Sequence, residues 1–240
     1  MDTPKYWDSF WDDNPILGAG GNDPDSMSKT LRQYHKILWS RMLSNGEKME
    51  LVESKSAYLT WKGFRFGSDS ITTSFRYTNY SWMIANLEQH LLDYRCFMEH
   101  FIHQTYTIGG SIIFPMHKNS INQKRGLNHQ IKDRWDLTLE CIRKFYLDEW
   151  SPLYDDLNRD KPFFDLFVDF RGYIDFFFLQ DCVSADYNSI TFWYGNGDFK
   201  ENPLPQTIDD YLNWIDCQLA FVKKRNERIK NFCCQNSPDN

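Results

Sequence analysis

Hydrophobic residues recur every three or four positions along several stretches of the chain, the spacing that places them on one face of an α-helix. Turn residues and short apolar runs lie between these stretches. The spacing predicts helices from Ser28, as the cap, to about Met42, over 81–104, over 127–148, over 152–159, and from Thr207 or Asp209 to about Phe232. The segment 163–180 is apolar nearly all round, so we expect it to form a central, enclosed helix.

A shorter period marks the segment between Met49 and Tyr77, where β-branched and aromatic runs alternate with turn residues. Such runs predict a small antiparallel sheet. The sequence TIGGSIIFP (107–115) predicts a glycine turn and a short buried strand that ends at Pro115, and ITFWYGNGDF (190–199) predicts a strand leading into an Asn-Gly turn. The expected fold class is therefore α+β: a mainly α-helical single domain with a small antiparallel β-sheet.

No repeat or linker divides the chain, so we expect one globular domain over residues 28–232. Residues 1–27 mix acids, Gly and Pro with an aromatic cluster, and they predict an N-terminal arm whose rings dock onto the domain. Residues 233–240 follow the last predicted helix, are mostly polar, and predict a flexible C-terminal tail.

The amino-acid composition excludes several classes of protein for this chain. Aromatic residues make up 17% of the 240 residues, and so many large apolar side chains exclude disorder for most of the chain. The formal net charge of −6 makes nucleic acid an unfavoured partner unless a local basic patch binds it. The chain shows no signal peptide, no run of 18 apolar residues and no C-x-x-C pair among its six cysteines. We therefore expect a cytoplasmic protein with reduced thiols, no membrane association and no bound metal.

One stretch departs from the acidic character of the chain. INQKRGLNHQIKDR (121–134) carries four basic residues against a single acid. Ser120 is a candidate cap before it, and the exposed amides of a helix start, with basic side chains beside them, bind phosphate or carboxylate. We therefore predict a ligand-binding site for an anion, formed by Asn122, Lys124, Arg125, His129, Arg134, Gly109 and Gly110. The alternative is a solvated helix entrance.

The glycine pair and the basic stretch are separated by only about ten residues, a length typical of a compact connection. We therefore expect Arg125 and Arg134, with Asn122 nearby, to border one concave, electropositive surface that faces Gly109 and Gly110. Glycines at that place would let a ligand approach the backbone closely.

Two acids of the apolar segment, Asp165 and Asp169, are spaced one helical turn apart and form a second candidate site. Paired carboxylates at this spacing hold a divalent metal or act as acid and base. The alternative is a structural ion pair with Arg171 or with a basic residue of 127–148. We expect the helix to be mostly buried and at least one of the acids to be paired, because a buried single charge is costly.

Arg95 and His100 have the R-x4-H spacing of a class of helical ribonucleases. In that chemistry the Arg holds the scissile phosphate while the His moves a proton. On a straight helix, however, positions i and i+5 diverge by about 140°, and Arg95 has a simpler partner in Glu99. We predict that Arg95 and His100 are not a catalytic pair.

Several segments follow one another in an order that matches a known family. They are LRQYHKILWSRMLSNG, FGSDSI, YTIGGSIIFP, SINQKRGLN, DRWDLTLECIRKFY and FFDLFVDFRGYIDFFFLQD. Together, from about residue 23 to 230, they resemble an uncharacterised bacterial family described as a domain of unknown function. The resemblance implies a bacterial or phage origin and a single-domain unit, and it implies no activity, cofactor or site residue.

Three functional hypotheses follow from these observations. The first is a cytoplasmic bacterial protein that binds a phosphorylated or otherwise anionic ligand, such as a nucleotide. The second is an enzyme that acts on RNA or nucleotides, of the toxin or phage-defence type. The third is a non-catalytic protein-interaction module that uses the aromatic arm. The sequence identifies no cofactor, protein partner or reaction, so whether the chain is an enzyme stays open.

Overall fold

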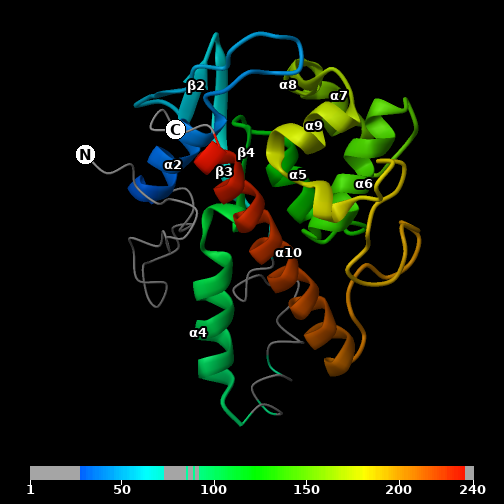
Figure 1. The fold of residues 1–240 in the computed structure, drawn as a ribbon. Helices are drawn as coiled ribbons and strands as arrows, with labels where there is room; N and C mark the ends of the chain where they lie inside the picture. Colours follow the sequence, from blue (N-terminus) through cyan, green and yellow to red (C-terminus); the bar gives the residue numbers. More distant parts are fainter. Residues whose placement is uncertain (1–27, 73–84, 86–88, 90–91, 236–240) are drawn as a thin grey trace.

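The computed structural model describes residues 28–72, 85, 89 and 92–235 (Figure 1). Its helices are α2 (Lys29–Trp39), α4 (Tyr94–Thr105), α5 (Ile121–Leu127), α6 (Trp135–Tyr146), α7 (Tyr154–Arg159), α8 (Lys161–Phe164), α9 (Phe170–Phe177) and α10 (Ile208–Gln235). Short 3-10 turns are η2 (Ile108–Gly110), η3 (Asp165–Phe167) and η4 (Gln180–Cys182). The strands are β1 (Val52–Glu53), β2 (Leu59–Trp61), β3 (Phe64–Ser70) and β4 (Ser111–Pro115). The expected α+β class, mainly helical with a small antiparallel sheet, is confirmed.

The described strands pair in the order β1-β2-β3-β4, all antiparallel. Lys62 and Gly63 connect β2 to β3, and their φ angles are 45° and 87°. A two-residue loop with both φ angles positive matches the right-handed twist of the strands that it joins. The last strand, β4, pairs with β3, and all five of its residues are buried. The predicted glycine turn and buried strand over 107–115 are thus confirmed.

Helix α10 runs diagonally across the front of the molecule in the view of Figure 1. Along its length it contacts α4, η2 and η4. The helix extends to Gln235, and Cys233 is buried, so residues 233–235 belong to the helix and not to the predicted tail. Residues 236–240 and the predicted arm over 1–27 lie outside the described residues.

Side chains cap the first and last described helices. Ser28 Oγ accepts the N–H of Leu31 at 3.0 Å, which confirms the predicted start of α2. At α10, Thr207 Oγ1 accepts the N–H of Asp210 at 3.1 Å, and the Asp210 carboxylate accepts the N–H of Thr207 at 3.3 Å. This reciprocal capping box satisfies two amides that a helix start leaves unpaired.

The single enclosed helix predicted over 163–180 is wrong. Val168 has φ 71° and ψ −54°, and the N–H of Asp169 donates to the carbonyl of Phe167 at 2.9 Å, so the chain turns sharply there. The Asp169 carboxylate then caps α9 by accepting the N–H of Gly172 at 2.7 Å. A Cβ on Gly172 would lie 2.1 Å from the Phe167 carbonyl oxygen, so this position admits only glycine. The apolar run is therefore two short helices folded against each other.

Two other predicted elements differ from the structure. The helix predicted over 127–148 begins only at Trp135, because Lys132 and Asp133 have φ angles of 49° and 63°, and Gly126 lies inside the separate helix α5. The strand predicted over 190–199 is only an isolated bridge between Val183 and Ile190. Helix α7 confirms the short helix over 152–159, while the helix over 81–104 lies partly outside the described residues.

Aromatic side chains of α8, η3 and α9 fill the centre of the core. The ring centroids of Phe163 and Phe167 lie 5.2 Å apart, and those of Tyr173 and Phe177 lie 5.0 Å apart. Trp39 from α2 packs on Phe177 at 5.1 Å. Tilted and edge-on ring pairs at such distances add stability beyond the apolar area that they bury.

Candidate functional site

Arg125, the centre of the predicted anion site, is fully buried on α5. Its Nη1 donates to Asp69 Oδ2 at 2.7 Å and to the carbonyl of Ser70 at 3.2 Å. Its Nη2 donates to the carbonyl of Asp133 at 3.0 Å, and its Nε donates to Thr138 Oγ1 at 3.1 Å. The Asp133 carboxylate lies 3.1 Å from Nη1 as a second counter-charge. The guanidinium therefore joins β3, the 128–134 loop and α6, and it does not face solvent.

The start of α5 already holds an anion from its own chain. Ser120 makes no side-chain cap. Instead, the buried carboxylate of Asp160 accepts the N–H of Ile121 at 2.9 Å through Oδ2 and contacts His117 Nε2 at 2.5 Å through Oδ1. Ser120 Oγ donates to Asn122 Oδ1 at 2.5 Å. A carboxylate at a helix N-terminus is favoured by the same amides that would bind a phosphate.

The glycine pair packs against protein. The N–H of Gly109 donates to Asn226 Oδ1 at 2.8 Å, and a Cβ on Gly109 would meet that oxygen at 2.7 Å. A Cβ on Gly110 would lie 1.8 Å from the carbonyl oxygen of Thr105. The expectation that Arg125 and the glycines border one concave surface is therefore wrong, because α10 covers the glycine turn. Of the other predicted residues, Lys124 is half-buried and His129 is exposed.

Arg134, at the start of α6, is buried and paired with Asp136, which has no exposed surface. Its Nε donates to Asp136 Oδ1 at 3.0 Å, and its Nη2 donates to Asp136 Oδ2. The same guanidinium donates to the carbonyls of Tyr194 and Pro203, each at 2.7 Å. Asp136 Oδ2 also accepts the N–H of Trp193 at 2.8 Å. The pair thus binds the backbone at Trp193, Tyr194 and Pro203, in a loop that includes most of the strand predicted over 190–199.

A pocket of ≈ 290 Å³ opens between this loop and α6. Its wall combines one aromatic ring, carboxamides, two carboxylates and the buried arginine. The lining residues are Arg134, Leu137, Tyr194, Gly195, Asn196, Asp198, Glu201, Asn202, Pro203 and Gln206.

Turns within the loop orient the pocket's carboxamides. Asn196 Oδ1 accepts the N–H of Asp198 at 2.8 Å, and Asn202 Oδ1 accepts the N–H of Leu204 at 3.0 Å. The Nδ2 groups of both asparagines have no partner among the described residues, so two amide donors are available to a ligand. Such side-chain-to-backbone bonds hold each amide in one orientation.

The charge of the pocket is negative. The positive charge of Arg134 is balanced by Asp136, whereas the exposed carboxylates of Asp198 and Glu201 have no cationic partner in the described part of the chain. The Tyr194 ring lies over the Arg134 guanidinium, 5.7 Å from its carbon. A phosphate here would meet two carboxylates and a neutralised arginine, while a neutral or positively charged group would meet acceptors.

The acidic residues of 163–180 lie at the surface. Asp165 pairs with Lys161 at 2.5 Å, and both side chains are more than half exposed. Asp169 is exposed and caps α9, and Arg171 is exposed with Asp175 at 3.7 Å. An ion pair is present as predicted, and most of the segment 163–180 is buried as expected, but Asp165, Asp169 and Arg171 lie on its exposed side. No cluster of three or more His, Cys, Asp or Glu suited to a metal occurs among the described residues.

Arg95 and His100 both belong to α4. His100 is exposed, and the side chain of Arg95 lies outside what the structure describes. The prediction that they are not a catalytic pair therefore stays a prediction.

A buried histidine was missed by the sequence analysis. His35 Nε2 lies 3.0 Å from Ser111 Oγ, and its Nδ1 lies 3.2 Å from the Tyr58 hydroxyl. Ser111 Oγ also lies 3.3 Å from the carbonyl of Ile108, so the hydroxyl can donate there while His35 donates to Ser111 and accepts from Tyr58. Burial, and then the charge of Arg225, lowers the pKa of His35 well below its ordinary value. Neither His35 nor Ser111 has any exposed surface, so Tyr58, His35 and Ser111 form a hydrogen-bonded group inside the core.

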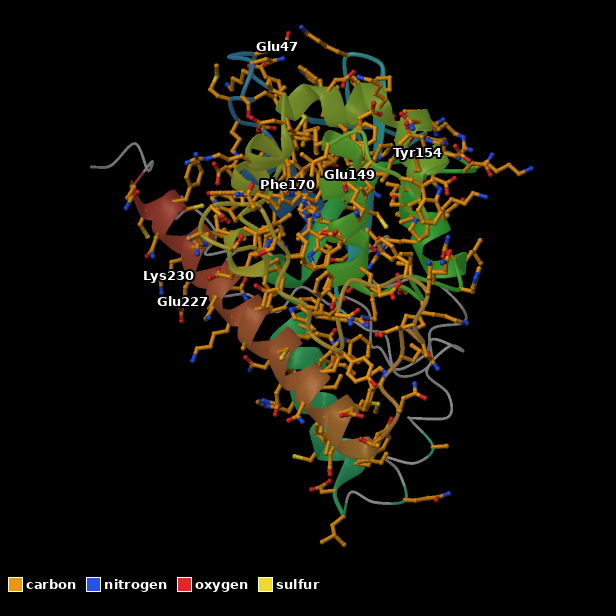
Figure 2. The ribbon with its side chains drawn as sticks, turned by 90° about the vertical axis from the view of Figure 1, so that its right-hand side faces the viewer. Glu47, Glu149, Tyr154, Phe170, Glu227 and Lys230 are labelled. Carbon is orange, nitrogen blue, oxygen red and sulfur yellow. The ribbon has the colours of Figure 1, made fainter. Side chains whose placement is uncertain are left out.

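Arg225 on α10 was also missed. It has no exposed surface, its Nη1 donates to the carbonyls of Gly109 and Ser111 at 2.8 and 2.7 Å, and its Nε donates to the carbonyl of Phe177 at 3.0 Å. The signal was present, because Arg225 continues the apolar stripe of α10 four residues before Ile229. Figure 2 shows the outer side of this helix, where Glu227 and Lys230 point away from the body of the protein.

Comparison with known proteins gives the family and nothing finer. No helix in the described residues has the length and apolar character that a membrane span requires. No curated protein and no solved structure matches the chain. The model of a family described as "Family of unknown function (DUF6994)" matches residues 7–229, nearly the whole chain, which confirms the resemblance to an uncharacterised family. The chain therefore belongs to this family of unknown function.

Proposed function

We propose that this protein binds a small polar molecule, neutral or positively charged, in the pocket beside Arg134. The observation that carries the proposal is the wall of the pocket. A buried ion pair, Arg134 with Asp136, holds the loop backbone in place. The loop then presents the Nδ2 groups of Asn196 and Asn202, which have no partner among the described residues, and the carboxylates of Asp198 and Glu201. A site built on a fixed backbone loses little conformational entropy on binding.

The chemistry of the wall favours a ligand with hydroxyl or amine groups. Asn196 and Asn202 supply amide donors, Asp198 and Glu201 supply carboxylate acceptors, and Tyr194 supplies a ring. Pockets for small molecules combine apolar surface with a few oriented polar groups in this way, and ≈ 290 Å³ lies at the lower end of their usual volumes. The volume fits a single sugar-sized or amine-sized molecule.

An anionic ligand, such as a nucleotide, remains a second hypothesis. Of the residues predicted for an anion site, all of which the structure describes, Arg134 alone lines this pocket. Because its charge is balanced by Asp136, we expect nucleotides and phosphate to bind more weakly than neutral or cationic molecules of the same size.

The test is calorimetric titration of the native protein with four classes of compound: monosaccharides and nucleosides, organic amines, nucleotides, and inorganic phosphate. We expect binding within the first two classes. Glu201→Gln and Asn202→Ala should weaken it by about tenfold or more, which corresponds to ~1.4 kcal/mol. Asn158→Ala removes an exposed carboxamide of α7 outside the pocket and should leave binding unchanged.

Failure to bind either of the first two classes would overturn the proposal, as would binding that both pocket variants leave intact. Preferential binding of nucleotides or phosphate would favour the second hypothesis instead.

The setting proposed for this function is the bacterial cytoplasm. The bacterial part is supported by the resemblance set out above. The compartment is supported by the cysteines: all six are described, none is in a disulfide, and Cys141 and Cys182 are buried. Free thiols are the rule in reducing compartments.

A further inference from the structure

Arg225 differs from the other fully buried arginines in what balances its charge. Arg125 is paired with Asp69 and Asp133, and Arg134 is paired with Asp136. The hydrogen bonds of Arg225 all go to backbone carbonyls, and it forms no ion pair with a carboxylate of the described residues. Carbonyl dipoles offset a guanidinium charge only in part, and an unpaired ion in a protein interior is strongly disfavoured.

One nitrogen of this guanidinium is unused. Arg225 Nη2 is buried and has no hydrogen-bond partner in the described part of the chain, although Nη1 and Nε are both bonded. The hydroxyl of Tyr173, a residue close enough to Arg225 to interact electrostatically with it, is likewise buried without a partner among those residues. Buried donors are nearly always bonded to protein, water or an ion.

A second cation, Arg41, lies near Arg225. The guanidinium carbons of Arg225 and Arg41 lie 5.9 and 5.6 Å from the ring of Trp39. Burial lowers the pKa of Arg225 to about 9, and among the groups that act on it electrostatically are Cys182, Tyr173 and Arg41, none of them a carboxylate. A water molecule at Nη2 would accept a hydrogen bond but leave the charge of Arg225 unbalanced. An anion would accept the hydrogen bond and also balance the charge.

We propose that a small monovalent anion, a halide such as chloride, binds at Nη2 of Arg225, between α10, the end of α9 and the start of β4. The site is separate from the Arg134 pocket, since the two share no lining residue. The site lies where α10 meets the end of α9 and the start of β4, which both contribute residues to the hydrophobic core. Because the unfolded chain cannot hold the anion in this way, halide binding stabilises the native state.

Two measurements test the site. Crystals grown or soaked in bromide should show anomalous density at hydrogen-bonding distance from Nη2. In solution, the melting temperature should be higher in sodium chloride or bromide than in sodium gluconate of the same ionic strength, by about 2–4 °C at saturation. Arg225→Met should abolish this difference. Arg228→Met, which removes a surface partner of Asp181 from the same helix, should retain it.

The crystallographic measurement uses the native protein, so it decides the question even if Arg225→Met does not fold. Bromide density at Nη2 supports the proposal. The proposal is overturned if Nη2 carries no bromide, if a halide-independent solvent peak occupies the place, or if a folded Arg225→Met protein keeps the native halide dependence.

Discussion

The guanidinium of Arg125 and the carboxylate of Asp69 form an ion pair at 2.7 Å between residues 56 positions apart in the chain. The pair attaches α5 to β3 and brings the basic stretch of the sequence into the protein interior. The charges that suggested an anion site are therefore used to hold secondary-structure elements together.

Arg125→Met tests this structural role. The substitution keeps a long side chain but leaves Asp69 and Asp133 without their cation, so we expect unfolding free energy to fall by about 3–5 kcal/mol. Lys124→Met, at the half-buried neighbouring position, should change it by less than about 0.5 kcal/mol. Urea denaturation of the three proteins measures the difference, and equal losses for both variants would contradict the structural role.

Gly110→Ala tests the packing of η2. The new Cβ would overlap the backbone carbonyl of Thr105, which no side-chain rotation relieves. We expect a loss of about 2 kcal/mol or more in unfolding free energy. Gly67→Ala is the matched control, since its Cβ would lie 3.7 Å from Met116 in ordinary contact. Thermal and urea unfolding provide the comparison, and a Gly110→Ala protein as stable as the control would show that this close approach is not real.

Thr207→Ala tests the capping box of α10. Loss of the hydroxyl leaves the N–H of Asp210 without its acceptor, so we expect a decrease of about 1 kcal/mol in stability. Asn213→Ala changes an exposed position inside the same helix and should not destabilise the protein. Denaturant midpoints measure both changes. A Thr207→Ala protein with the native midpoint would argue against the cap.

His35 makes stability depend on pH. Its pKa is lowered in the folded protein, first by burial and then by Arg225, while in the unfolded chain it is about 6.5. Below that pH the unfolded state takes up a proton that the native state does not. The stabilisation is therefore fully present above about pH 6.5 and is lost as the pH falls towards the folded pKa, by up to ~1.4 kcal/mol per pH unit.

The measurement is the free energy of unfolding between about pH 7.5 and about pH 5, a range that includes the reference pKa of histidine. His35→Gln should be less stable at neutral pH and show a shallower decline than the native protein. His129→Gln, at an exposed position, should follow the native profile. A His35→Gln profile parallel to the native one would assign the acid sensitivity to other groups.

Much of the fold could be read from local pattern. The caps at Ser28 and Thr207, the buried strand ending at Pro115 and the apolar face of α10 all follow from residues within a few positions of one another. Helix caps and side-chain periodicity act over one or two turns, so a short window of sequence contains the information. The α+β class followed from the number of segments with helical spacing and the number with strand-like spacing.

The residues of the candidate site, apart from Arg134, could not be predicted from local sequence pattern. The sequence gives the sign of each charged side chain but does not show which group in the folded protein pairs with it. The partners lie far along the chain: Asp69 for Arg125, and the carbonyls of Tyr194 and Pro203 for Arg134.

Helices, turns and apolar faces could be placed from local sequence, because they depend on neighbours a few residues apart. Which charges are buried, and which groups balance them, depends on the tertiary structure. Arg125 and Arg134 meet carboxylates, and Arg225 meets only carbonyls. The physical reason is that removing a charge from water is so costly that its fate depends on distant groups brought together by folding.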